Sequence, residues 1–307
     1  MGLTELLRAC ERSSGATPVP DDLAAFWEPR VAAAEAPREV ALRPADVRTA
    51  CAEYLELRYV ATDGAPLVAR ALVPLGAGPH PCALVLHDLG RPQRGWLHLT
   101  RFVAAGYAVV APERRPWSGE ALGLAALAQL VDDALVAACA CATLPRVDAR
   151  ALVAWGEGLG GGLAVAVSAL LPGRVRAAAA LNPLPADLRG MWEQGATGPV
   201  GEALDRHFRD ADPTCARADE WFGALAYADP ASLATLLACP YLQGTCLLDQ
   251  SAPPIAQCAL YNRVLGAHKR LVTYPRHAHE RVNDFEDRLL EFLPGAARGG
   301  TDPLPGR

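Results

Sequence analysis

The sequence predicts an α/β fold, with a mostly parallel central sheet and helices on both of its faces. Three observations predict it. Short apolar runs without polar alternation recur along the chain, as buried parallel strands require. Longer segments with helical periodicity separate these runs. A polar break at Asp63-Gly64 lies between two alternating runs and indicates an antiparallel hairpin at the start of the sheet.

The expected elements follow one another in a regular order. An N-terminal helical extension is expected over about residues 1–50, because "DDLAAFWEPRVAAAE" has a periodic apolar face behind aspartates that could cap it. The run "YLELRYVATDGAPLVARALVP" is the hairpin. The later strands are expected in "CALVLH", "YAVVAP", "ALVAW", "RVRAAAALNP", "CPYLQGTCLLD" and "KRLVTYP". The helices between and after them are expected in "GWLHLTRFVAAG", "LAALAQLVDDALVAACACATL", the run from Leu159, "PPIAQCALYNRVLG" and "HERVNDFEDRLLEFL".

The whole chain, residues 1–307, is interpreted as a single domain. Its 307 residues, 51% of them hydrophobic, suffice for one large core. A mostly helical stretch over about residues 184–237 interrupts the strand–helix rhythm and is expected to be an insertion. The end of the chain, residues 295–307, is rich in glycine and proline and is expected to be a flexible tail.

Composition and charge exclude several classes of function. The net charge of −5 and the lack of a basic stripe argue against a nucleic-acid partner. No apolar run of membrane-spanning length and no secretory signal are recognised, so a cytoplasmic protein without a membrane partner is expected. The nine cysteines include no C-x-x-C pair, which favours reduced, buried thiols over a metal site. No metal or other cofactor is expected.

The stretch "AWGEGLGGGLAVAVSALL" directly follows an apolar run and admits two interpretations. The first is a dinucleotide-binding loop, Gly156-x-Gly158-x-x-Gly161. Such a loop needs an acidic residue at the end of the next strand to bind the ribose, but "RVRAAAALNP" ends in Asn182 and Pro183. The loop also lies in the middle of the predicted sheet, whereas this motif usually opens its domain. A nicotinamide or flavin enzyme is therefore disfavoured.

The second interpretation is the nucleophile elbow Gly-x-Ser-x-Gly, the sharp strand-to-helix turn of an α/β-hydrolase. Its crowded backbone requires tiny residues two before and two after the nucleophile, and Gly156 and Gly160 meet that requirement. The nucleophile position itself is Gly158, which has no hydroxyl. The fold's chain order of nucleophile, acid and base then points to Asp249, which ends "GTCLLD", and to His279, which follows "RLVTYPRHA".

Two backbone amides are candidates for the oxyanion hole of such a site. They belong to Leu89 in "LVLHDLG" and to Leu159, the residue after the elbow position. Simpler roles stay open for the acid and the base. Asp249 could merely cap the helix that begins near Pro253, and His277 competes with the later histidine.

These motifs together resemble the acetyl xylan esterase/cephalosporin-C deacetylase family, carbohydrate esterase family seven of the α/β-hydrolases. The similar segments are "DDLAAFWEPRV", "LVLHDLGRPQRGW", "LPRVDARALVAWGEGLGGG", "GTCLLDQSAPP" and "YNRVLGAHKRLVTYPRHAHE", and the match runs from about residue 20 to about residue 293. The resemblance implies an α/β-hydrolase fold, carboxylic ester hydrolysis, and a small ester or acetylated sugar as ligand. It also implies a homo-oligomer.

The departures from the family pattern fall on its chemistry. Gly158 stands in place of the serine, Leu159 in place of a glutamine, and Asp88 in place of the glycine after the oxyanion-loop histidine. The segment "PERRPWSGE" departs from the Arg-Gly-Gln motif. These departures predict a family member that is impaired in ester hydrolysis. If the rest of the site is intact, the substitution Gly158→Ser is expected to restore some esterase activity.

Two active alternatives remain open from the sequence. Asp249 and His279 could activate water directly as a base pair. A relocated serine could also replace the missing nucleophile, the candidates being Ser118, which follows a strand, and Ser251, which lies just past Asp249.

Overall fold

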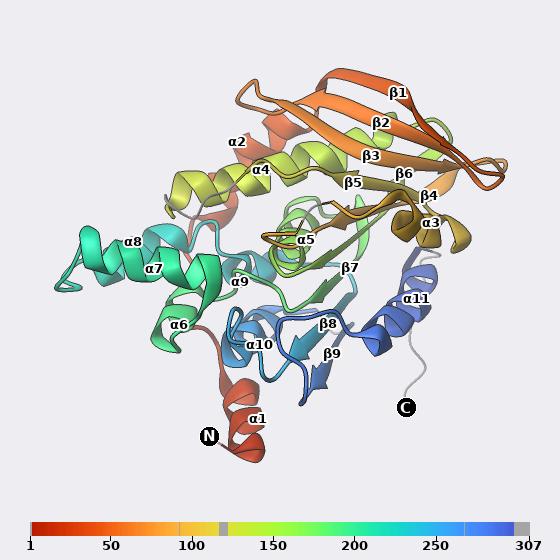
Figure 1. The fold of residues 1–307 in the computed structure, drawn as a ribbon. Helices are drawn as coiled ribbons and strands as arrows, with labels where there is room; N and C mark the ends of the chain where they lie inside the picture. The colour runs from red at the N-terminus through yellow and green to blue at the C-terminus, as the bar shows by residue number, and fades with distance from the viewer. Residues whose placement is uncertain (1, 92, 117–121, 267, 298–307) are drawn as a thin grey trace.

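A nine-stranded sheet forms the centre of the molecule in the computed structural model, which describes residues 2–91, 93–116, 122–266 and 268–297 (Figure 1). The strand order is β1-β2-β3-β5-β4-β6-β7-β8-β9. The pairs from β1 to β5 along this order are antiparallel, and all pairs from β5 to β9 are parallel. The predicted fold class is thereby confirmed, including the antiparallel hairpin that leads the sheet.

The elements have the following bounds. The strands are β1 (Arg38–Arg48), β2 (Ala52–Val60), β3 (Pro66–Pro74), β4 (His80–Leu86), β5 (Ala108–Pro112), β6 (Val147–Glu157), β7 (Val175–Leu181), β8 (Tyr241–Cys246) and β9 (Lys269–Tyr274). The helices are α1 (Leu3–Arg12), α2 (Leu23–Ala34), α3 (Trp96–Ala104), α4 (Leu124–Ala140), α5 (Leu159–Leu170), α6 (Leu188–Glu193), α7 (Gly198–Asp210), α8 (Ala218–Leu225), α9 (Pro230–Leu233), α10 (Pro254–Arg263) and α11 (Asn283–Ala297), with short 3-10 turns at Cys141–Thr143 and Ala234–Leu236.

The N-terminal part differs from the helical extension expected over about residues 1–50. Helices α1 and α2 are present, but Arg38–Arg48 form the strand β1, which pairs with β2. All of its residues are exposed or half-buried, because β1 is the edge strand of the sheet. Val40, Leu42, Ala45 and Val47 are only half-buried against the two cores, and an irregular register on either side of Pro44 interrupts the strand, so its hydrophobic pattern is weaker than that of the inner strands.

Each face of the sheet buries its own hydrophobic core. On β4, Leu84 belongs to the core that includes residues of α2, α4 and α5, whereas the next residue, Val85, belongs to the core that includes residues of α3 and α11. This alternation follows from the two-residue period of a strand. Figure 1 shows α4 and α5 on one side of the sheet and α3 and α11 on the other. Helices α6 to α9 lie between β7 and β8 in the chain.

One helical segment, Leu124–Thr143, is long and apolar enough to cross a membrane by length and composition alone. The sequence-based expectation that no run reaches this length is therefore wrong. However, 72% of the apolar stretch of this segment is buried inside the protein, where α4 packs against α2 and α5. Such burial is typical of a core helix, because a membrane span would turn its apolar side chains outward.

The parallel strands place the site. Because β4, β6, β8 and β9 run in the same direction, their carboxyl ends meet at one edge of the sheet. The segments that follow these four strands carry Asp88, Gly158, Asp249 and His279. Residues far apart in the chain are thereby brought to one place, as is usual at the strand ends of open α/β sheets.

Candidate active site

The turn from β6 into α5 has the tight geometry that the glycines predict. Gly158 has φ +53° and ψ −122°, a backbone conformation that residues with a side chain rarely adopt. Its amide donates to the Leu181 carbonyl at 2.9 Å, and its carbonyl accepts from the Leu184 amide at 2.9 Å. A Cβ on Gly160 would overlap the Leu86 carbonyl, so β4 passes directly beside the start of α5. Backbone hydrogen bonds and close backbone packing therefore hold this turn firmly.

Asp249 and His279 lie together at this edge of the sheet. The Nδ1 atom of His279 is 2.7 Å from Oδ2 of Asp249, whose side chain is completely buried. The other oxygen, Oδ1, accepts from the amides of Ser251 and Ala252, both at 2.9 Å. Asp249 therefore both orders the turn before α10 and orients the imidazole. His277 is not in this position, because its ring packs against Tyr274.

Asn182, at the end of β7, holds the loop that carries His279. Its Oδ1 accepts from the Cys246 amide at 2.9 Å, and its Nδ2 donates to the carbonyls of Ala278 and Glu280 at 3.5 and 3.4 Å. These two carbonyls flank the histidine in the chain. In the sequence, Asn182 is notable only because it is not the acidic residue that a dinucleotide-binding site needs. Its contacts are with residues that follow or end other strands, and these are its neighbours only in the folded chain.

The carboxylate of Asp88 occupies the centre of the site. Its Oδ1 accepts from the Leu89 amide at 2.7 Å and from the Leu159 amide at 3.0 Å. Its Oδ2 lies 3.0 Å from Nε2 of His279. The two amides expected from the sequence to form an oxyanion hole thus both donate to one atom, Oδ1 of Asp88. In the sequence, Asp88 stands out only as a departure from the family pattern, and nothing there indicates these contacts.

Asp88 and Gly158 depend on each other sterically. A Cβ on Gly158 would overlap Oδ1 and the carboxyl carbon of Asp88 and would lie 2.8 Å from Oδ2. The space that a serine side chain would need is therefore filled by the aspartate. In the sequence, Asp88 and Gly158 are two separate departures from the family pattern. Only the folded chain shows that the two positions are in contact.

His279 lies between two carboxylates, and this arrangement sets its charge. Burial alone would lower its pKa, but the hydrogen bonds and charges of Asp249 and Asp88 outweigh burial and raise the pKa to about 10. For Asp88, burial would raise the pKa, but the bond to His279, the charge of that ring and the two amides together hold the pKa below its usual range. At neutral pH the site therefore holds a carboxylate beside a protonated imidazole.

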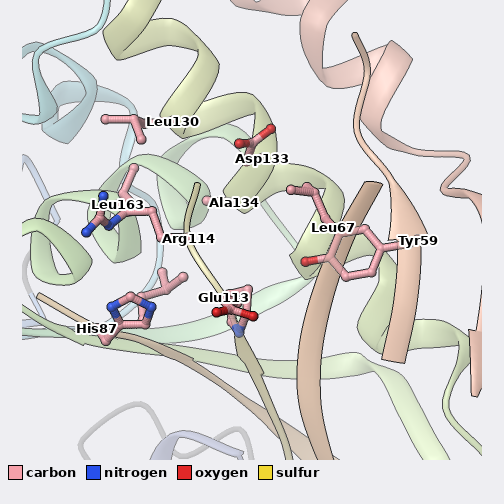
Figure 2. A pocket seen from close by; sticks show the side chains of 11 residues that line it. Tyr59, Leu67, His87, Glu113, Arg114, Leu130, Asp133, Ala134 and Leu163 are labelled. Atoms are coloured by element: carbon pink, nitrogen blue, oxygen red, sulfur yellow. The ribbon is translucent and has the colours of Figure 1, made fainter. Parts of the chain in front are cut away.

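A small cavity lies next to His87, the residue before Asp88 (Figure 2). Its volume is about 30 Å³. The lining includes His87 and Arg114, whose Nε2 and Nε atoms are buried without a hydrogen-bond partner. At roughly 10–15 Å³ for each water, the cavity has room for about two water molecules. It is far too small for a sugar ester.

Ser118 and Ser251 are the two candidates for a relocated nucleophile. Ser118 lies outside the described residues. Ser251 lies beside Gly198 at the start of α7, with its Oγ 3.2 Å from where a Cβ on that glycine would be. Both ring nitrogens of His279 face carboxylates, Nδ1 toward Asp249 and Nε2 toward Asp88. Neither nitrogen is left to accept a proton from Ser251. Across the described part of the chain, no group of three or more metal-binding side chains is arranged to hold a metal ion.

Comparisons with known proteins agree with this fold. The family model for acetyl xylan esterase matches residues 1–123 and 127–295. The crystal structure of acetyl xylan esterase 1 from Thermoanaerobacterium sp. JW/SL YS485 is similar, with a TM-score of 0.86 and 26% sequence identity over 96% of this chain and 99% of that one. An acetyl xylan esterase from Paenibacillus sp. R4 gives a TM-score of 0.86 at 22% identity, covering 96% of this chain and 100% of that one.

A more distant similarity is to a puromycin-hydrolyzing peptidase from Mycobacterium tuberculosis. Its TM-score is 0.63 at 19% identity, over 83% of this chain and 41% of that one. At this identity the similarity shows the α/β-hydrolase fold alone. No curated protein sequence matches this one.

Proposed function

Because the chain belongs to the acetyl xylan esterase family, we propose that it is a homologue of these carboxylic ester hydrolases whose ester hydrolysis is impaired. One observation carries the proposal. The side chain of Asp88 accepts hydrogen bonds from both oxyanion amides. It also fills the space next to Gly158 where the side chain of a nucleophilic serine would lie.

Ester hydrolysis by this type of site needs three things, and all three are compromised. A nucleophile must attack the acyl carbon, but Gly158 has no side chain. A neutral histidine must accept the proton of the nucleophile, but the pKa of His279 is raised to about 10 by its two carboxylate partners despite its burial. The oxyanion hole must be empty, but Asp88 already accepts both of its hydrogen bonds. The residual ~10³–10⁴-fold catalysis that a triad-less site can retain depends on a usable hole.

The intact Asp249–His279 pair favours one second candidate, an active hydrolase that uses activated water. That mechanism needs a free, neutral Nε2 on His279, whereas this atom faces Asp88 at 3.0 Å. We therefore rank it second. The ligand class that we propose is the one implied by the family, a small ester or an acetylated sugar. The cytoplasmic location, the homo-oligomer and the single-domain organisation remain predictions.

The test is a measurement of acyl transfer by the full chain. The protein should hydrolyse p-nitrophenyl acetate no faster than a His279→Ala variant, and it should not react with a fluorophosphonate probe. A stoichiometric fluorophosphonate adduct on Ser118 or Ser251, located by peptide mass spectrometry, would show a relocated nucleophile. Acetate release that disappears in the His279→Ala variant, without any adduct, would favour activated water instead.

A further inference from the structure

The geometry points to a different reaction for the same site. We propose that Asp88 is a carboxylate nucleophile that opens a small epoxide, and that His279 and Asp249 then hydrolyse the resulting ester of Asp88. The inference rests on the proposed loss of acyl transfer, because an esterase cycle would need the oxyanion hole that Asp88 fills.

The position of Oδ1 carries the argument. An oxyanion hole stabilises the carbonyl oxygen of the ester that is being hydrolysed, because negative charge develops on that oxygen. Here the oxygen in the hole belongs to Asp88, at 2.7 Å from the Leu89 amide and 3.0 Å from the Leu159 amide. The ester to which this hole is fitted is therefore an ester of Asp88 itself. The other oxygen, Oδ2, is outside the hole and is the atom that would form the new bond.

The chemistry of a carboxylate selects the class of substrate. Attack on an acyl carbon would produce an anhydride, which is less stable than the ester it came from. Attack on a saturated carbon produces an ester, which is a stable intermediate of the kind that aspartate nucleophiles form. An epoxide suits this site in particular, because its ring oxygen needs a proton as the ring opens. The protonated Nε2 of His279, 3.0 Å from Oδ2, is the donor.

The first step is balanced by these two groups alone. Oδ2 forms a bond to one epoxide carbon, the carbon–oxygen bond of the ring breaks, and the proton of Nε2 moves to the ring oxygen. The product is a hydroxyalkyl ester of Asp88 beside a neutral His279. The carboxylate charge that helped to raise the pKa of His279 is then gone, so the imidazole stays neutral at neutral pH and can accept a proton in the next step.

The second step regenerates the site. His279, oriented by Asp249, takes a proton from water, and the hydroxide attacks the carboxyl carbon of Asp88. The negative charge forms on Oδ1 in the two-amide hole. Collapse expels the alkoxide, which takes the proton back from His279, and a diol leaves. The remaining proton of the Asp88 carboxyl group passes to His279, which restores carboxylate and imidazolium. The net reaction adds one water to one epoxide.

Access to the site limits the size of the substrate. The Asp88 side chain is only 5% exposed, and that of His279 is 21% exposed. Gly90, two residues after Asp88 in the chain, is exposed, and a Cβ on it would meet nothing within 4 Å. The guanidinium group of Arg91 lies close to the carboxylate, with Nε 3.8 Å from Oδ2 of Asp88. Because both side chains are largely buried, we expect only a compact epoxide to reach Oδ2.

The experiment uses the full chain, 1,2-epoxypropane as the probe, and water labelled with ¹⁸O. Because water attacks the carboxyl carbon, repeated turnover should place ¹⁸O in Asp88, where peptide mass spectrometry detects it. Asp88→Asn should abolish both label and diol. This substitution keeps an oxygen for the two amides and is close in shape, and a thermal melt checks its fold. Asp205→Asn, at an exposed aspartate of α7, is the matched control and should behave like the parent.

Each outcome decides between mechanisms. Label in Asp88 that requires the epoxide supports the proposal. Diol formed without label shows that water attacks the epoxide directly and overturns it, and so does a folded protein that forms neither. Hydrolysis of p-nitrophenyl acetate is measured on the same samples. Its presence would contradict the proposed loss of esterase activity whether or not Asp88 becomes labelled, so the two failures are distinguishable.

Discussion

The carboxyl group of Asp88 fills the space beside Gly158, so any Cβ at position 158 would overlap it. This relationship alters the expectation, formed from the sequence, that Gly158→Ser alone would restore esterase activity. A serine at 158 would have to displace a buried carboxylate that accepts two amide hydrogen bonds and faces His279. A side chain at position 158 therefore requires a smaller residue at position 88.

The first prediction follows from this coupling. Neither Gly158→Ser nor Asp88→Gly alone should hydrolyse p-nitrophenyl acetate above background. The double variant should exceed the better single variant by at least about tenfold, because only it has both a hydroxyl and an empty oxyanion hole. Gly158→Ser alone should also destabilise the protein by more than the ~1–3 kcal/mol of its backbone strain, because of the overlap. Equal activity in the Gly158→Ser and double variants would contradict the steric argument.

The second prediction concerns pH. The pKa of His279 is raised to about 10, above the ~6.5 of an unfolded histidine, by two carboxylates that outweigh its burial. Its stabilising contribution is thus complete below about pH 6.5 and is lost as the pH rises toward 10. The pKa of Asp88 is lowered, so its contribution is present above about pH 4 and is lost as the pH falls further.

Urea denaturation between pH 6 and pH 10 measures this effect. The parent protein should lose more stability over this interval than Asp88→Asn, in which one carboxylate partner is gone. The NMR titration of His279 should have its midpoint near 10 in the parent and a lower midpoint in the variant. Identical titrations of the two proteins would mean that Asp88 does not hold the proton on this ring.

The third prediction concerns Asn182, which positions the His279 loop. Removing the side chain in Asn182→Ala leaves the Cys246 amide buried without its acceptor and should cost about 1–3 kcal/mol. Asn182→Asp keeps the acceptor but loses the donors to Ala278 and Glu280, so it separates the two roles. If the side chain positions the ring, both variants should also shift the NMR titration midpoint of His279. A stability loss with an unchanged midpoint would show a structural role only.

The sequence predicts those parts of the site that follow from the order of strands. The elbow and Asp249 follow the buried strands β6 and β8, and His279 follows the half-buried strand β9; parallel strands bring their carboxyl ends to one edge. Asp88 follows such a strand too, but the sequence does not show that its carboxylate turns into the gap beside Gly158. Contacts of this kind depend on side-chain directions across elements that are far apart in the chain, and periodicity does not encode them. The edge strand β1 was missed because its apolar residues are only half-buried and its register is irregular on either side of Pro44.

The last prediction tests the elbow itself. A Cβ on Gly160 would overlap the Leu86 carbonyl and lie 2.8 Å from the His87 amide, and backbone atoms of an inner strand cannot move aside cheaply. Gly160→Ala should therefore destabilise the protein by about 3 kcal/mol or more, the range of severe core overpacking. Gly223 is the matched control, because it lies within α8 and a Cβ there would meet nothing within 4 Å. Gly223→Ala should stabilise the protein by up to about 1 kcal/mol through helix propensity. Urea denaturation of the two variants compares them directly. A Gly160→Ala protein as stable as the parent would show that β4 does not approach the elbow this closely, and the oxyanion position of Asp88, which follows β4, would then need to be revised.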